Sequence, residues 1–243
     1  LKSKLESTDK EIAIISHTVI SPTQKKLFDD FQAKYPSAKV YSYELFDNRN
    51  SINAWRKCYG TEATPVWQWD KAKIILALES DFLNTEGHVT EQAAKYAKTR
   101  DVDNIDNFSR LYAVEAGMSL TGANADYRMR LTPEKQLDFV LALLNEAIKG
   151  RMDVPAEIVN AAANTSLADF AKTNNLDQKK TASLLKDLKD NKGKSIISVG
   201  ESLPEEVHIA AIYLNEVLGN STLIDKKQRN QYQMPYATDD ELS

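Results

Sequence analysis

The sequence predicts an α/β protein with a doubly wound, mostly parallel sheet that helices cover on both faces. Two observations predict this fold class. Short apolar runs rich in Val, Ile and Leu recur along the first half of the chain, and segments with a helical apolar period separate them. Uninterrupted apolar runs are typical of strands buried on both faces, and strands that alternate with helices favour parallel pairing.

The first predicted strand lies within residues 11–20, and we expect it to be buried on both faces. A helix follows, because Ser21 can cap it, Pro22 suits its first position and Gln24 completes a capping box. Pro36 ends this helix, and residues 39–45 predict the second strand.

The next elements alternate in the same way. A short helix over residues 52–59 ends at Gly60, and residues 72–78 predict the third strand. A helix over 90–98 and a fourth strand over 111–116 follow. Thr132 and Pro133 then begin a long amphipathic helix that ends at Gly150.

The character of the chain changes near residue 150. We therefore predict a doubly wound domain over residues 1–152 and a smaller helical and α/β return segment over 153–243. Within the return segment, the patterns predict helices over 155–191, a short buried strand over 195–200, a second capping box over 202–205, a core helix over 207–218 and an irregular polar tail from residue 225.

The composition excludes several classes of function. The 243 residues carry 31 Lys and Arg against 35 Asp and Glu, so the basic footprint of a nucleic-acid-binding protein is missing. The one cysteine, Cys58, cannot form a disulfide within the chain, and the three histidines have no metal-ligand spacing. No apolar run approaches the ~20 residues of a membrane span, so we expect no direct membrane insertion.

Polar residues that follow predicted strands mark the candidate site, because ligands bind at the carboxyl ends of parallel strands. Glu79 and Asp81 follow the third strand and Glu115 ends the fourth, so adjacent strands would bring them together. The predicted binding residues are Ser80, Asp81, Thr121, Asn124, Asp126, Gly200 and Glu201. No residue is predicted to be catalytic or to bind a metal.

Structural roles for the same residues stay open. Asp81 can cap the following loop, Gly200 can serve a tight turn, and Asp126 can pair with Arg128 or Arg130 to fix its loop. His208 lies on the core helix on the same face as Asn215, which favours a hydrogen-bonded core histidine.

Three stretches carry a resemblance to a known family. They are Glu79-Ser-Asp-Phe-Leu83, residues 103–115 and Ser119-Leu-Thr-Gly-Ala-Asn-Ala-Asp-Tyr-Arg128. With the helix that begins at Thr132 and the return segment that ends in Leu218-Gly-Asn220, the chain resembles the molybdopterin oxidoreductase superfamily. Within it, the chain is most similar to the molybdopterin-oxidoreductase-like region of the large iron-sulfur subunit of bacterial alternative complex III.

The resemblance implies a module of a quinol-oxidising electron-transfer complex on the periplasmic face of a membrane, with the other subunits of that complex as partners. It implies iron-sulfur clusters only in parts of the protein outside this chain. Where pterin enzymes of the superfamily carry Asn-Pro, this chain has Asp81-Phe82, and a carboxylate there would repel the cofactor's phosphates. We therefore expect a cofactor-free, non-catalytic module.

Two alternatives remain open. The chain can be a genuine binding domain for molybdopterin guanine dinucleotide, with the seven candidate residues lining the pocket. It can also be an unrelated nucleotide-binding protein of Rossmann-like fold, although no Gly-rich phosphate-binding fingerprint is present.

Overall fold

The central sheet of this protein has four parallel strands in the order β6-β5-β4-β7. The computed structural model describes residues 10–149, 156–163 and 166–242. The strands are β4 (Ile74–Leu78), β5 (Arg110–Glu115), β6 (Tyr127–Arg130) and β7 (Ser195–Val199). Every residue of β4 is apolar and buried, as the middle of a parallel sheet requires. The predicted α/β class with a mostly parallel sheet is confirmed.

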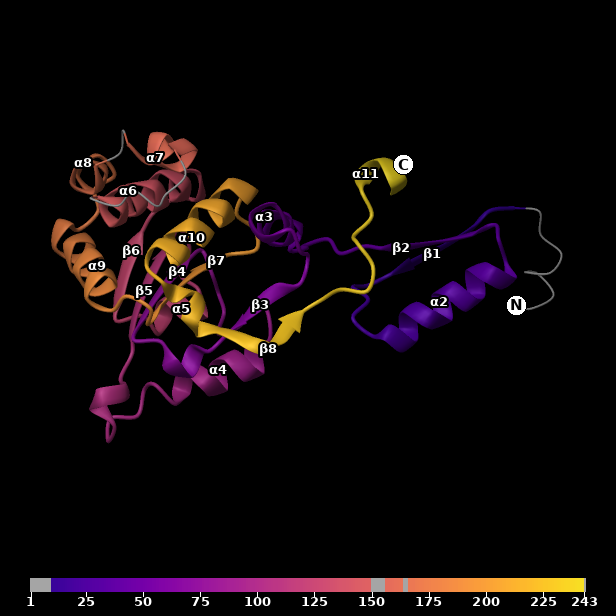
Figure 1. Ribbon diagram of the computed structural model, residues 1–243, viewed down its shortest axis with the longest axis horizontal. Helices are drawn as coiled ribbons and strands as arrows, with labels where there is room; N and C mark the ends of the chain where they lie inside the picture. The colour runs from indigo at the N-terminus through magenta and orange to yellow at the C-terminus, as the bar shows by residue number, and fades with distance from the viewer. Residues whose placement is uncertain (1–9, 150–155, 164–165, 243) are drawn as a thin grey trace.

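Helices cover both faces of this sheet (Figure 1). On one face, Leu76 and Val114 join a core with α6 (Gln136–Ile148) and α10 (Glu205–Val217). On the other face, Ile75 and Leu111 join a second core with Phe82 and with Tyr96 of α4 (Val89–Ala97). Successive residues of β4 and β5 therefore point to opposite faces of the sheet and pack in different cores.

The return segment supplies helices and one strand of the same sheet. The helices are α7 (Ala156–Ala162), α8 (Leu167–Thr173) and α9 (Gln178–Asp190), and α8 and α9 contribute buried residues to the core around α6. β7 pairs with β4 in parallel over its whole length. The predicted domain boundary after residue 152 lies outside the described residues and stays a prediction.

An antiparallel pair lies beside the sheet. β3 (Thr64–Trp67) pairs with β8 (Ile224–Asn230), with a register shift between Pro65 and Trp67. The prediction of an irregular tail from residue 225 is therefore wrong over 225–230. Residues 227–229 are polar and exposed, so no apolar pattern marks this strand. Backbone pairing with β3 holds it in place.

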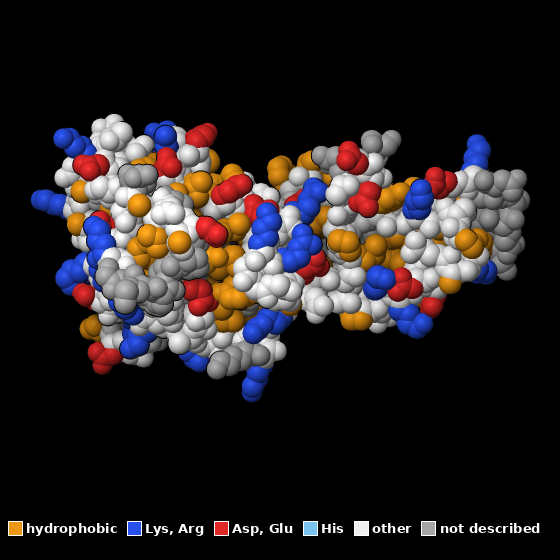
Figure 2. All heavy atoms as spheres, turned by 45° about the horizontal axis from the view of Figure 1, so that its top comes forward, with side chains coloured by type: hydrophobic (Ala, Val, Ile, Leu, Met, Phe, Trp, Pro, Cys, Tyr) orange, Lys and Arg blue, Asp and Glu red, His pale blue; other side chains and the backbone are white. Residues whose placement is uncertain are grey.

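An arm projects from the body (Figure 1). It consists of β1 (Ile12–Ser16), α2 (Pro22–Lys34) and β2 (Ala38–Ser42), and β1 pairs with β2 in parallel. The prediction that the first strand is buried on both faces is wrong, because Ile15 is 66% exposed in this two-stranded sheet. Figure 2 shows hydrophobic side chains along the arm between charged ones.

The helix caps agree only in part with their predictions. Ser21 caps α2 through its side chain, and Pro22 is the first helical residue. The Gln24 side chain donates to Ser16 Oγ at 3.4 Å and does not close a capping box. At α10 the capping residue is Pro204, so the predicted box from Ser202 to Glu205 is absent.

The remaining elements connect these layers. α3 (Arg49–Tyr59) ends at Gly60 with a φ of 70°, as predicted, and packs on α10. The short elements are the 3-10 helices η1 (Trp69–Lys71), η2 (Ile105–Asn107), η3 (Pro133–Lys135) and η4 (Asn220–Leu223), and the α-helical turns α5 (Leu120–Ala123) and α11 (Asp239–Leu242). Among the described helices, none is both long and apolar enough to cross a membrane.

Candidate functional site

The carboxyl ends of β4, β5 and β7 meet at one edge of the sheet, which we call the carboxyl edge. In register, Leu78 of β4 lies opposite Val114 of β5 and Val199 of β7. The chain leaves these strands through residues 79–81, 116–122 and 200–201. The predicted neighbourhood of Glu79, Asp81 and Glu115 follows from this pairing.

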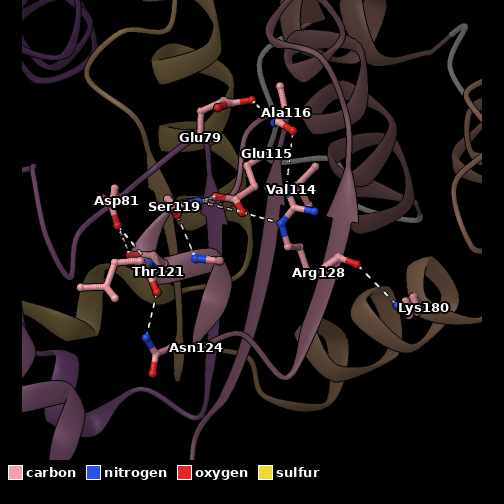
Figure 3. Close-up of polar contacts among 12 residues, drawn as sticks. Glu79, Asp81, Val114, Glu115, Ala116, Ser119, Thr121, Asn124, Arg128 and Lys180 are labelled. Atoms are coloured by element: carbon pink, nitrogen blue, oxygen red, sulfur yellow. Dashed lines mark hydrogen bonds and ion pairs between the residues drawn. The ribbon is translucent and has the colours of Figure 1, made fainter.

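Asp81 holds the start of the short helix α5. Its Oδ1 accepts hydrogen bonds from the backbone N–H and the hydroxyl of Thr121, both at 2.9 Å (Figure 3). The Thr121 hydroxyl in turn accepts from the backbone N–H of Leu83 at 3.1 Å. Asp81 and Thr121 are thus brought together, and Asp81 satisfies an orphan donor at a helix start.

Glu115 lies buried beneath the same loop. It accepts from Arg128 Nε at 2.6 Å and from Ser119 Oγ at 2.6 Å (Figure 3). Arg128 therefore neutralises Glu115 and does not pair with Asp126. Gly122 packs directly on this carboxylate, since a Cβ at Gly122 would lie 1.7 Å from Glu115 Oε1.

Glu79 bridges the ends of β4 and β5. Its Oε1 accepts from the backbone N–H of Ala116 at 2.6 Å (Figure 3). Burial raises the pKa of Glu79, the Ala116 N–H opposes that shift, and the Glu115 carboxylate adds to it. Glu79 also adopts a positive φ of 50°. Its carbonyl oxygen approaches Gly200 so closely that a Cβ there would lie 2.3 Å away.

Glu86 is a central residue of the site that sequence reasoning missed. Its carboxylate accepts from Ser80 Oγ at 3.0 Å and from the backbone N–H of Glu201 at 3.0 Å. Ser80 also bonds Ser198 at 2.8 Å. Burial raises the pKa of Glu86 to about 7. No local pattern marks Glu86, because the loop after β4 folds back to reach Glu201.

Two predicted residues lie away from this cluster. Asn124 donates to the carbonyl of Leu120 at 2.8 Å and thereby closes its own turn. Asp126 accepts from Leu111 N–H at 2.8 Å, near the amino end of β5, and forms two bonds of 2.9 Å with Arg100. Burial works to raise the pKa of Asp126, but the bonds from Arg100 and Leu111 outweigh it and lower the pKa.

The structure therefore gathers Ser80, Asp81, Thr121, Gly200 and Glu201 at the carboxyl edge and places Asp126 toward the opposite end of β5. A cavity of about 750 Å³ opens beside Ser80 and Glu201 and extends toward β3, β8 and α10. His208 and Asn215 of α10 both line it. In the described part of the chain, no group of three or more His, Cys, Asp or Glu could hold a metal ion.

Comparison with known proteins gives a likeness in fold. Neither a protein-family model nor a curated protein sequence matches the chain. Among solved structures, acetylene hydratase from Pelobacter acetylenicus matches with a TM-score of 0.60 and 12% sequence identity. The match covers 90% of this chain and 31% of that one. At this identity the likeness concerns the fold alone, and the chain spans less than a third of that protein's length.

Proposed function

We propose that this chain is a structural module of a larger protein built on the architecture of the molybdenum and tungsten enzymes, and that it holds no pterin cofactor. The shared fold with acetylene hydratase, a molybdenum or tungsten enzyme, supports the architecture. The resemblance of residues 109–128 to the molybdopterin oxidoreductase superfamily supports the same class of protein.

One observation carries the cofactor-free part of the proposal. At the carboxyl edge, three backbone N–H groups at strand ends bond protein carboxylates. Asp81 accepts from Thr121, Glu79 from Ala116, and Glu86 from Glu201. Loop N–H groups at strand ends are the usual donors to cofactor phosphates, so here carboxylates stand in the place of a bound phosphate.

The charges at the edge add a second obstacle to a phosphate-bearing cofactor. Arg128, a cation at this edge, is already bonded to Glu115 at 2.6 Å. Two negative charges 4 Å apart repel by about 4 kcal/mol at an effective dielectric constant near 20. The donor set is therefore a poor match for molybdopterin guanine dinucleotide, and we derive no reaction step through that group.

At a finer level, we propose that the module belongs to the iron-sulfur subunit of a quinol-oxidising electron-transfer complex. Its partners would be the other subunits of that complex, at the periplasmic face of a membrane. This rests on the resemblance of residues 79–83, 103–115 and 119–128 to the large subunit of alternative complex III. Cross-linking of the complex isolated from its host tests it, because cross-links from this module to the other subunits are expected.

Cofactor analysis of the full-length protein tests the main proposal. The protein is isolated from a host that makes molybdopterin, and molybdenum, tungsten and oxidised pterin are quantified per chain. We expect far less than one equivalent of each. One equivalent of pterin would contradict the proposal and favour a genuine dinucleotide-binding domain, whereas stabilisation by a free dinucleotide alone would favour an unrelated nucleotide-binding protein.

A further inference from the structure

The arm formed by β1, α2 and β2 has a strand edge that is open along β1. The backbone N–H of Ile12 donates to the carbonyl of Ser37, just before β2. Alternate residues of a parallel strand point their N–H and C=O groups to the same side, so those of Ala13 and Ile15 point away from β2. No described residue forms a hydrogen bond with these outward groups. β1 also contains neither a charged residue nor a proline, which are the usual protection of an edge strand.

The opposite edge of the arm, along β2, differs because this chain covers both of its ends. The Gln32 side chain donates to the carbonyl of Ala38 at 3.1 Å. The carbonyl of Ser42 accepts from the N–H of Ala237 at 2.8 Å, and Ser42 forms a parallel bridge with Tyr236. Residues near the end of the chain therefore lie beside β2, where the yellow C-terminal tail meets the arm in Figure 1.

One face of the arm is uncovered as well. The Gln24 side chain of α2 donates to Ser16 Oγ at 3.4 Å, so α2 lies on the face of the sheet to which Ser16 points. Successive side chains of a strand point to opposite faces, so Ile15 points to the other face, where it is 66% exposed. Tyr41 of β2 is its partner in register and points the same way. Parallel sheets occur almost only with both faces covered, so the arm lacks one layer.

Further apolar side chains are exposed where the two strands of the arm end. Ile20 follows β1 and is 63% exposed, and Leu45 and Phe46 follow β2 and are 74% and 90% exposed. Hydrophobic side chains are visible along the arm in Figure 2. A sheet of two strands is marginally stable in water, and exposed apolar patches mark interaction surfaces. The open edge, the uncovered face and these side chains together indicate a missing partner.

A second copy of this chain would cover the edge but not the face. Two β1 strands related by a two-fold axis pair in antiparallel fashion, with the axis normal to the joined sheet. Such an axis places both α2 helices on the same face, so Ile15 and Tyr41 of each copy stay uncovered. The partner must therefore bring both a strand and a layer that covers the face opposite α2.

The geometry of the arm and the likeness in fold indicate where such a partner comes from. Tyr236 bridges β2 on its outer side, so in a larger protein the polypeptide that follows α11 starts near the arm. Crossovers in parallel sheets share one hand, so a connection that returns from there to the outer edge of β1 lies on the face opposite α2. The likeness in fold covers 90% of this chain, and the unmatched part is shorter than the arm, so part of the arm belongs to the shared fold. More than two thirds of the other protein lies outside the match.

From these observations we propose that a strand of the same polypeptide, following this chain, pairs in parallel with the outer edge of β1. The segment that leads to this strand crosses the face opposite α2 and packs apolar side chains on Ile15 and Tyr41. The added strand bonds the outward N–H and C=O groups of Ala13 and Ile15. The inference rests on the proposed function, because it takes this chain to be a module of a larger protein, and it names the surface through which the module joins the rest.

Hydrogen exchange of the full-length protein tests this inference. A monomeric fraction without other subunits is compared with this 243-residue chain by itself, and peptides of β1 and β5 are followed by mass spectrometry. We expect β1 to exchange slower by roughly tenfold or more in the full-length protein, and β5 to exchange at the same rate in both. An unchanged rate for β1 would overturn the proposal. Protection that appears only with another subunit, or that rises with protein concentration, would overturn it in favour of that subunit or of a second copy.

Two matched substitutions in the full-length protein locate the covered face. Ile15→Lys places a charge against the proposed layer and should restore fast exchange of β1. Leu27→Lys, at a residue of α2 that is 63% exposed, is the control and should leave the exchange unchanged. Equal effects of the two substitutions would contradict the proposal, even if the chain by itself does not fold. The pterin analysis reads a different property of the same protein, so either proposal can fail alone.

Discussion

At the scale of single residues, Asp81 makes the contacts that an anion would make at the carboxyl edge. It accepts from the N–H and the hydroxyl of Thr121 at 2.9 Å each. Charge-assisted hydrogen bonds of this kind are among the stronger ones in proteins. Asp81 therefore stabilises the start of α5.

Asp81→Ala is expected to lower the free energy of unfolding by about 1–3 kcal/mol, because it leaves two donors of Thr121 without their acceptor. Urea denaturation measures the loss. The control is Asp106→Ala, an exposed residue on η2, with an expected change within ~0.5 kcal/mol. Equal effects of the two substitutions would contradict the role of Asp81.

Gly122 of α5 and Gly117 of the loop before it form a matched pair. Gly122→Ala should destabilise the protein by on the order of 2 kcal/mol, because the new Cβ would lie 1.7 Å from Glu115 Oε1, which Arg128 and Ser119 hold in place. Gly117→Ala should be nearly neutral, since nothing lies within 4 Å of its Cβ position. Thermal melts of both variants check this, and equal midpoints would contradict it.

The pH dependence of stability reports on Glu86. Burial raises its pKa from 4.5 to about 7, so the folded state holds the proton more tightly than the unfolded state. Its contribution to stability is full below pH 4.5 and is lost as the pH rises toward 7. His208, with its pKa lowered to about 4, acts in the opposite direction, since its contribution is lost as the pH falls below 6.5.

Glu86→Gln isolates the first effect. Relative to the parent protein, the variant should gain on the order of 2 kcal/mol in unfolding free energy between pH 4.5 and pH 7.5, measured by urea denaturation across that range. Glu157→Gln, at an exposed position, should show no such trend. A parallel pH profile for Glu86→Gln and the parent protein would rule out a raised pKa at Glu86.

The sequence predicts the site residues that follow strands and misses those that depend on loop folding. Asp81, Glu115 and Glu201 come directly after or at the end of apolar runs, so their common edge follows from strand adjacency. Glu86 and the placement of Asp126 depend on where loops turn back. Asp126 pairs with Arg100, which precedes β5, and not with Arg128 or Arg130, the partners that its local spacing offers.

At the scale of elements, the arm and the central sheet differ in what holds them. α2 has no buried residue, and β1 and β2 form a two-stranded parallel sheet that gains one bridge, from Ser42 to Tyr236. Two-stranded sheets are marginally stable in water. β4 and β5 lie inside a four-stranded sheet between two apolar cores.

Hydrogen exchange should therefore separate the two parts. We expect the amides of β1, β2 and α2 to exchange far faster than those of β4 and β5, because local opening exposes little apolar surface in the arm. Mass spectrometry of exchanged peptides measures this. Equal protection of Ile14 and Leu76 would mean that the arm is held by contacts the structure does not contain.

The sequence predicts the elements that have an apolar run or a helical apolar period. It does not predict strands that form only by pairing with a strand far away in the sequence. β4, β5, β7 and the helix α6 follow from apolar runs and from the helical period. β8 is polar and exists only through its pairing with β3, more than 150 residues away in sequence. The exposure of β1 also follows from tertiary context, since its apolar run is compatible with a buried strand.

At the scale of the whole molecule, the topology brings three strand ends together from both halves of the chain. β7 returns after the helical segment to pair with β4, and Glu201 thereby reaches Glu86. The result is an edge at which side-chain carboxylates accept hydrogen bonds from loop N–H groups. We propose that these carboxylates occupy the positions that a bound anion would take.

The most direct test is an experimental structure of the full-length protein isolated from a host that makes molybdopterin. We expect Asp81 Oδ1 within about 2.9 Å of Thr121 N, with Glu79 bonded to Ala116 N and no pterin density beside them. Density for a pterin phosphate on either N–H group, with the carboxylates turned away, would contradict it.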